Sequence, residues 1–227
     1  MFQLFNFIGL ISFAFSGAVK GIQKKMDVFG IAVLGISTAL GGGAVRDILA
    51  GGISQMLKDI SYVGLSLVGV LLAMATRKFY RRVKNRWTFL LPDALGLATF
   101  TVSGCLVAVR NNFGVVGFII LGLSTAVGGG MLRDMLAGEE PLILNREFYA
   151  SCAFAGSLLF WTLTKLQLSG PLTSGISMLT VFLLRVAAIK FGAFRNYHTM
   201  RKECVKLPDI PAAVDIYRFA GYIRSLV

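Results

Sequence analysis

Apolar residues gather along the chain in seven long stretches, which short segments rich in charged residues and glycine separate. An α-helix needs roughly 20 consecutive apolar residues to cross a bilayer, and the stretches approach or exceed that length. They cover residues 2–19, 28–50, 60–76, 89–109, 115–137, 148–163 and 172–188. The pattern predicts an all-α membrane protein with seven transmembrane helices.

Part of the second stretch recurs in the fifth. Residues 35–51 read GISTALGGGAVRDILAG and residues 122–138 read GLSTAVGGGMLRDMLAG, so the two segments agree at 12 of 17 positions. The same offset of 87 residues aligns the first stretch with the fourth and the third with the sixth. Because each repeat then crosses the membrane an odd number of times, the second repeat enters from the opposite side. We expect two inverted three-helix repeats plus a seventh helix.

This offset also sets the predicted boundaries. A single transmembrane domain covers residues 1–190, and residues 191–227 form a cytoplasmic tail. Within the domain, repeat one covers 1–87, repeat two covers 88–174, and the seventh helix covers 172–190. The composition agrees with membrane insertion, since 56% of the residues are hydrophobic, 15% are charged and the mean hydropathy is +0.73.

Lysine and arginine are concentrated in alternate loops. They follow the first, third and fifth stretches and fill the tail, whereas the opposite loops hold only Lys58, Arg110 and Lys165. Because basic loops stay in the cytoplasm, we expect the N-terminus outside and the C-terminus inside the inner (cytoplasmic) membrane. The net charge of +12 is then a signal of topology, with no nucleic-acid partner implied. The basic cluster at 77–86 also suits contact with anionic membrane lipids.

The chain lacks the sequence signatures of common enzymes. It contains no nucleophile elbow, phosphate-binding loop, metal-ligand spacing or pair of catalytic carboxylates. We therefore predict that the protein is not an enzyme and uses no cofactor or fixed metal ion.

Three consecutive glycines lie in the middle of the second and fifth stretches. Each costs about 1 kcal/mol relative to alanine inside a helix, so we predict that both helices are interrupted there. An interruption would free backbone carbonyls for transient coordination of a dehydrated cation. The predicted pore-lining residues are Gly41, Gly42, Gly43, Gly128, Gly129, Gly130, Ser37, Thr38, Ser124 and Thr125. The alternative is that the glycines allow close helix packing.

An Arg-Asp dipeptide follows each triplet, as Arg46-Asp47 and Arg133-Asp134. We expect each aspartate in the first turn of the half-helix after the break, where the helix dipole favours an anion. Charges inside a membrane are costly and usually functional. Adjacent residues on a helix point about 100° apart, so we expect each arginine to pair with another helix rather than with its neighbour. The candidate partners are Asn6, Asp93 and Glu147.

The two arginines receive different interpretations. We interpret Arg133 as a gate, because the carboxylates of Glu139, Glu140 and Glu147 can compete for it at the cytoplasmic side. Arg46 has few charged residues near it in the sequence, and we interpret it as structural. Anchoring of both arginines by salt bridges is the alternative.

The duplicated motif S-T-A-[LV]-G-G-G-x-x-R-D-[IM]-L-A-G, the F-x-x-S-G of the first and fourth stretches, and Glu140-Pro141 form a specific set. This set resembles prokaryotic members of the trimeric intracellular cation (TRIC) channel family. The resemblance implies a homotrimer with a separate pore in each subunit and conduction of monovalent cations, potassium favoured. The family's pore glycines correspond to the two triplets, and its adjoining basic positions correspond to Arg46 and Arg133. Asn6 departs from the family pattern, since relatives often carry aspartate there.

Two other functions remain open from the sequence. An inverted repeat with interrupted helices also suits a secondary transporter of a small solute such as glycine. A non-conducting membrane scaffold is a weaker alternative, because the intramembrane charges argue against it.

Overall fold

The computed structural model describes residues 2–54, 58–76, 87–145 and 148–205, with side chains up to Lys190. The chain divides into two compact units, Met1–Ile189 and Lys190–Val227. The described part of the second unit is the helical continuation of α10 to Val205. The basic cluster at 77–86 and the rest of the tail lie outside the described residues.

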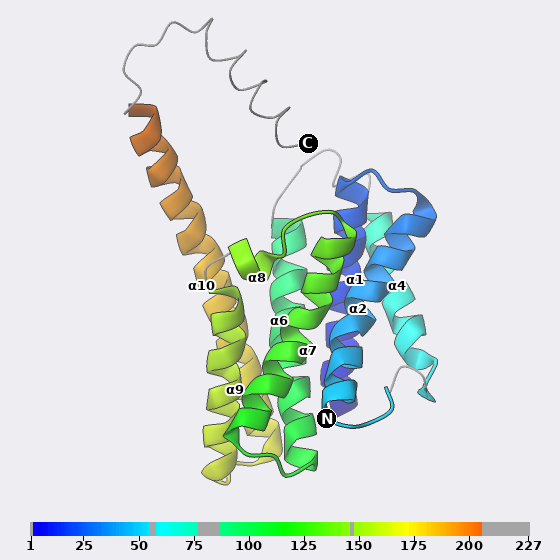
Figure 1. The fold of residues 1–227 in the computed structure, drawn as a ribbon, viewed down its shortest axis with the longest axis vertical. Coiled ribbons are helices and arrows are strands. Elements are labelled where there is room, and N and C mark those ends of the chain that lie inside the picture. Colours follow the sequence, from blue (N-terminus) through cyan, green and yellow to red (C-terminus); the bar gives the residue numbers. More distant parts are fainter. Residues whose placement is uncertain (1, 55–57, 77–86, 146–147, 206–227) are drawn as a thin grey trace, which may run out of the picture. The chain divides into compact units, whose positions relative to one another are not determined.

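The described residues form helices and no strands, and each of the seven predicted stretches overlaps one helix (Figure 1). The helices are α1 (Phe2–Gln23), α2 (Val28–Leu49), α4 (Ser61–Ala75), α6 (Trp87–Arg110), α7 (Val115–Leu136), α9 (Tyr149–Lys165) and α10 (Gly170–Val205), with a short α8 (Leu142–Asn145). The all-α prediction is confirmed for this part of the chain.

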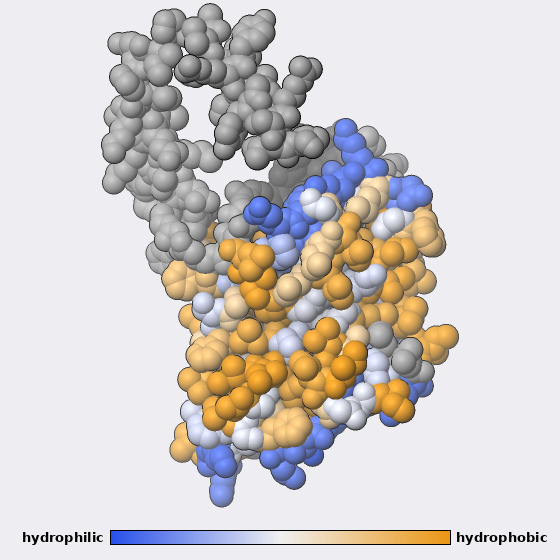
Figure 2. All heavy atoms as spheres, viewed as in Figure 1, coloured by the Kyte–Doolittle hydropathy of each residue, from blue (hydrophilic) through white to orange (hydrophobic). Residues whose placement is uncertain are grey.

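Among the described residues, five helices are long and apolar enough to cross a membrane, namely α1, α2, α6, α7 and the segment Gly170–Lys190 of α10. The other two are shorter, with 15 residues in α4 and 17 in α9. A broad apolar band lies between two hydrophilic ends of the bundle (Figure 2). Large apolar side chains such as Leu71 and Leu179 are exposed, as contact with lipid requires. The protein is an integral membrane protein.

Helices α1 and α6 are the most buried and pack against each other in the centre of the first unit. Helices α2 and α4 pack on α1, α7 and α9 pack on α6, and α2 crosses α7. In Figure 1, α1 and α4 run upward and α2 downward, whereas α6 and α9 run downward and α7 upward. The two sets of three helices thus run in opposite directions, the arrangement that inverted repeats produce.

Helices α2 and α7 continue through their glycine triplets without a break. Each helix ends instead just before the last glycine of the motif, which has φ +73° at Gly51 and φ +65° at Gly138. This left-handed conformation suits glycine, and it closes the end of the helix by a backbone bond from Gly52 to Asp47 or from Glu139 to Asp134. The motif thus encodes a helix end after the triplet, and the helix does not break at the triplet itself.

Candidate functional site

The glycine triplets form the crossing point of α2 and α7. A Cβ atom placed on Gly42 would lie 2.1 Å from the carbonyl oxygen of Thr125, and one on Gly129 would lie 2.2 Å from that of Thr38. The contacts are reciprocal, and each joins one helix backbone to the other. Only glycine permits such an approach, so the packing alternative explains the middle glycine of each triplet.

The predicted interruption is therefore wrong. Close backbone packing offsets the intrinsic cost of three glycines, and both helices keep their hydrogen-bond ladders. Even the threonine hydroxyls are engaged, because Thr38 donates to the Leu34 carbonyl at 2.6 Å and Thr125 to the Leu121 carbonyl at 2.5 Å. Ser37 and Ser124 are partly buried beside them. Whether these residues line a path for ions remains a prediction.

Two aromatic rings fill the space beside the crossing. Phe13 of α1 and Phe100 of α6 meet edge to face, with ring centroids 5.0 Å apart and both side chains buried. Gly96 and Gly9 leave room for these rings, since a Cβ at either position would lie within 2.4 Å of the opposing ring. The centre of the bundle is thus closed by aromatic side chains and the glycine crossing.

The first polar cluster surrounds Arg46 in the last turn of α2. Its guanidinium donates to Asp47 Oδ1 at 2.8 Å, to Asn6 Oδ1 at 3.1 Å and to Ser103 Oγ at 2.7 Å. Asn6 also donates to the Tyr62 hydroxyl at 3.3 Å. The cluster therefore joins α1, α2, α4 and α6, and its one arginine and one carboxylate balance in charge.

The second polar cluster surrounds Arg133 in the last turn of α7. Its guanidinium pairs with Asp93, donates to Asp134 Oδ1 at 2.9 Å and reaches Ser16 Oγ at 3.1 Å. The Tyr149 hydroxyl lies 3.5 Å from Asp93 Oδ1. Both Arg133 and Asp93 are completely buried, so this cluster holds one arginine and two carboxylates away from solvent.

The two clusters correspond residue by residue at the offset of 87. Asn6, Arg46, Asp47 and Tyr62 correspond to Asp93, Arg133, Asp134 and Tyr149. The serines are exchanged between the repeats: Ser103 of the second repeat binds Arg46, and Ser16 of the first binds Arg133. This exchange is what a pseudo-twofold axis between the repeats produces.

Two expectations about the Arg-Asp dipeptides need correction. Each arginine does pair with its own aspartate, because the long arginine side chain folds back across the helix end despite the 100° between adjacent positions. The aspartates also lie in the last turn of an unbroken helix, not in the first turn after a break. An aspartate there opposes the helix dipole, and the paired arginine compensates for it.

The predicted partners of the arginines are largely confirmed. Asn6 and Asp93 bind Arg46 and Arg133, whereas Glu147 lies outside the described residues. Each guanidinium also stacks on an aromatic ring, with Arg46 5.1 Å from the Phe2 centroid and Arg133 4.7 Å from the Phe89 centroid. Phe2 and Phe89 again correspond at the offset of 87.

Glu139, one of the predicted competitors for Arg133, binds other residues. It pairs with Lys20 and lies 2.8 Å from the Lys24 ammonium. Hydrogen bonds from Lys20 and then Lys24 hold the pKa of Glu139 below its usual value. One premise for Arg133 as a gate is therefore removed.

A pocket adjoins the first polar cluster. It is bounded by Asn6, Arg46, Asp47, Tyr62 and Phe100. Leu10, Ala39, Leu40, Gly43, Ala44 and Ser54 complete its lining. Its free space holds about one water molecule, which is also the size of a dehydrated potassium ion.

Sequence reasoning did not assign Ser16, Ser103, Tyr62 and Tyr149 to the site. The repeat held the signal, because each of these residues has an identical counterpart at the offset of 87. Arg185 of α10, whose guanidinium carbon lies 4.4 Å from the centroid of the Tyr149 ring, was also missed. It has no counterpart, since the seventh helix is unpaired. Its signal was a single charge inside an apolar stretch.

Comparison with known proteins agrees with this geometry. A family model described as "Glycine transporter" matches residues 3–78 and again residues 90–165, with starts 87 residues apart. The fold is similar to a solved TRIC cation channel, with a TM-score of 0.72 and 39% identity over 85% of this chain and 94% of that one. The chain belongs to the TRIC channel family.

Other relatives cover a similar share of the chain. The TRIC orthologue from Rhodobacter sphaeroides is 34% identical, with a TM-score of 0.77 over 84% of this chain and 98% of that one. A UPF0126 membrane protein of Deinococcus radiodurans is 39% identical over 206 residues, 89% of each chain. The inner membrane protein YadS of Escherichia coli K12 is 35% identical over 82% of this chain and 90% of its own length.

Proposed function

We propose that the protein is a passive channel for monovalent cations, with potassium favoured and one path in each subunit of a homotrimer. The observation that carries the proposal is the pair of polar clusters buried at opposite ends of one helix crossing. Charged groups inside a membrane protein usually mark a path for ions or substrates. The likeness to a TRIC cation channel supports the same function.

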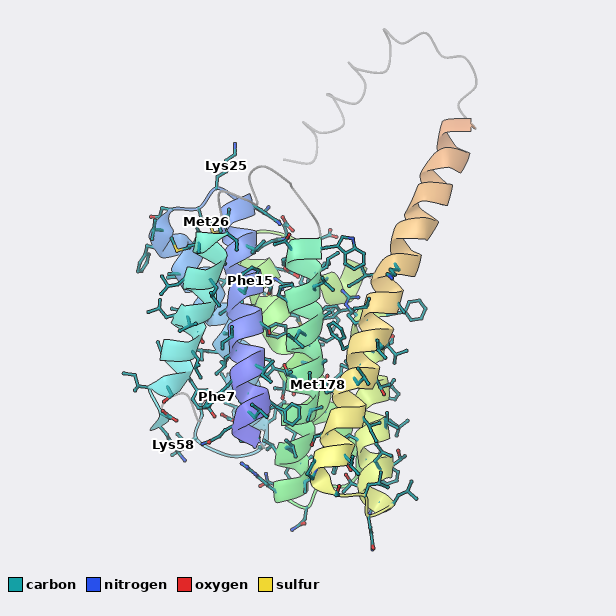
Figure 3. The ribbon with its side chains drawn as sticks, turned by 180° about the vertical axis from the view of Figure 1, so that it is seen from behind. Phe7, Phe15, Lys25, Met26, Lys58 and Met178 are labelled. Carbon is teal, nitrogen blue, oxygen red and sulfur yellow. The ribbon has the colours of Figure 1, made fainter. Side chains whose placement is uncertain are left out.

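The proposed topology has seven membrane-crossing helices, with the N-terminus outside and the C-terminus in the cytoplasm. Lys25 and Lys58, which the sequence assigns to opposite loops, lie at opposite ends of the bundle (Figure 3). The Lys25 end also carries Lys20 and Lys24 beside Glu139. This end is the cytoplasmic one in our proposal, and the YadS likeness supports insertion in an inner membrane.

The proposed path runs between α1, α2, α6 and α7, past Phe13 and Phe100, and is closed at the glycine crossing. Of the two arginines, Arg46 is the better candidate for a moving group, because it lines the pocket and binds a single carboxylate. Arg133 is held by two carboxylates and Ser16 without contact with solvent. This assignment reverses our interpretation from the sequence.

A matched pair of substitutions tests the path. A side chain at Gly43 has room, since the nearest atom to its Cβ position is 3.8 Å away, and it would fill the pocket. Gly64 is exposed on α4 with nothing within 4 Å of its Cβ position. In planar-bilayer recordings we expect unitary potassium currents from the wild type and Gly64→Leu, and strongly reduced currents from Gly43→Leu. Wild-type currents from a folded Gly43→Leu variant would contradict the path.

The second candidate is a secondary transporter of a small solute such as glycine. The description of the matching family model favours it. The pocket argues against it, because space for about one water molecule does not hold a glycine molecule. Saturable glycine counterflow into proteoliposomes, without unitary currents, would establish this alternative.

A further inference from the structure

The inner face of α10 carries polar side chains that lack partners. Among the described residues, five buried side-chain atoms have no hydrogen-bond partner, and four of them lie on this face: Thr173 Oγ1, Ser174 Oγ, Ser177 Oγ and Arg185 Nε. Thr180 of the same helix differs, because it donates to the carbonyl of Ile176 at 2.8 Å. Met178 lies between α6 and α10 (Figure 3), so the face is turned toward the core. Buried polar side chains normally have hydrogen-bond partners, so this group without partners indicates that the face has a polar or electrostatic function.

Arg185 is the charged residue of this face. Its side chain is only 3% exposed, and no ion pair holds it within the described part of the chain. Its guanidinium carbon lies 4.4 Å from the centroid of the Tyr149 ring. A cation above an aromatic face is attracted to it, but this attraction alone does not neutralise a buried charge.

Tyr149 connects Arg185 to the second polar cluster. Its hydroxyl lies 3.5 Å from Asp93 Oδ1, the oxygen that also pairs with Arg133. The other oxygen, Asp93 Oδ2, is the fifth buried atom without a partner. Arg185, whose Nε lacks a partner, thus lies at the face of the Tyr149 ring, and Asp93, whose Oδ2 lacks one, lies at its hydroxyl.

Arg185 also balances the charge of the second polar cluster. Arg133 with Asp93 and Asp134 carries a net charge of −1, and Arg185 brings the total to zero. The first polar cluster is already neutral with Arg46 and Asp47, because Asn6 occupies the position of Asp93. The repeat without a seventh helix also lacks the second carboxylate.

We propose that Arg185 is the counter-charge of Asp93 across the Tyr149 ring, and that it thereby limits the preference for cations over anions at the second polar cluster. The effect on permeation rests on the proposed channel function. The pairing of Arg185 with Asp93 does not, so the two can fail separately. Arg185 is a positioning residue, since it acts through Tyr149 and Asp93.

The first experiment measures the permeability ratio of potassium to chloride from the reversal potential in a KCl gradient. Arg185→Gln should raise this ratio roughly twofold or more, the effect of one unit charge within about 10 Å of a hydrated path. Asp93→Asn should lower it, and the double variant should return to the wild-type ratio. Arg185→Lys, which keeps the charge, should also match the wild type. An unchanged ratio in a conducting Arg185→Gln channel would overturn the effect on permeation.

The second experiment needs no conduction. It compares the thermal unfolding midpoints of Asp93→Asn, Arg185→Gln and the double variant in detergent. We expect the double variant to lose less than the sum of the single losses, because removal of both charges leaves neither one unpaired. Additive losses would overturn the pairing. Absence of currents from the wild type, with the non-additive losses intact, would overturn the channel and keep the pairing.

Two control variants test whether the coupling is specific to Arg185 and Asp93. Arg110 stacks on Phe2 at 4.2 Å in the same manner but is exposed, so Arg110→Gln and Asp93→Asn should be additive. Glu147 is a nearby carboxylate in the sequence, two residues before Tyr149. Arg185→Gln and Glu147→Gln should also be additive. If Arg185→Gln were non-additive with Glu147→Gln and additive with Asp93→Asn, the partner of Arg185 would be Glu147, and the proposal would be overturned.

Discussion

The two polar clusters share one sequence motif and one hydrogen-bond pattern, yet they differ in charge and in the free space beside them. The first holds one carboxylate and borders a pocket. The second holds two carboxylates, is completely buried at Arg133 and Asp93, and is completed by Tyr149 and Arg185. The comparison indicates that the duplicated motif specifies how each helix ends and binds its arginine. The residues around the motif specify what each end of the bundle can do.

A small number of positions produce the difference. Asn6 corresponds to Asp93, which changes the charge, and Ser54 corresponds to Pro141 in the segment after the motif. Gly43 and Gly130 are identical in sequence but differ in surroundings. A Cβ on Gly130 would lie 2.9 Å from the Tyr149 hydroxyl, whereas one on Gly43 would meet no atom closer than 3.8 Å. The space beside Gly130 in the second repeat is therefore filled, whereas the corresponding space beside Gly43 in the first repeat is open.

The largest expected effect is the loss of stability when either cluster arginine is replaced. Arg133→Ala leaves Asp93 and Asp134 buried without their cation, so it should lower the free energy of unfolding by about 3–5 kcal/mol. Arg46→Ala exposes Asp47 to the pocket, where water can enter, and should cost about 1–3 kcal/mol. Denaturant unfolding in detergent, followed by circular dichroism, measures both. Equal losses would show that the two clusters are energetically alike.

The next effect concerns the third glycine of each triplet. Gly130→Ala forces the Tyr149 side chain away from the helix and should destabilise the protein by about 1–3 kcal/mol. Gly43→Ala meets no close atom and gains helix propensity, so it should be neutral or stabilise by up to about 1 kcal/mol. Thermal unfolding of the two variants makes the comparison. If Gly43→Ala lost as much stability as Gly130→Ala, the space beside Gly43 would not be open as described.

The smallest effect is a dependence on pH through Glu139 of the second half. Glu139 binds Lys20 and Lys24, whereas the corresponding position in the first repeat is Gly52. Because the pKa of Glu139 is lowered, its contribution is complete above the ordinary glutamate pKa and is lost as the pH falls through the lowered value. The side chain is 38% exposed, so we expect less than about 1 kcal/mol.

Glu139→Gln provides the test. The unfolding midpoint of the variant should fall below that of the wild type at neutral pH, and the two should converge in acid. A constant difference between them at every pH would exclude the ion pairs as its cause.

The sequence predicted the helices well and the site in part. Apolar stretches anticipated seven of the described helices, but not the short α8, because membrane insertion imposes both length and composition on a helix. The duplication identified the residues of both clusters, including Asn6 and Asp93 as partners of the arginines. The sequence did not predict that α2 and α7 continue through their glycine triplets. Helix propensity measures the cost of three glycines in one helix, and it contains no contribution from the backbone of a second helix packed against them.

By itself, the sequence determined that this chain enters a membrane, that it contains the same unit twice, and that each unit carries an Arg-Asp pair near its glycines. These are properties of composition and order. Only the tertiary structure decided that Gly42 and Gly129 meet carbonyls of the opposite helix, that each arginine bonds its neighbouring aspartate, and that Arg185 lies over Tyr149. These contacts join residues from different helices or depend on side-chain conformation, and local pattern contains neither.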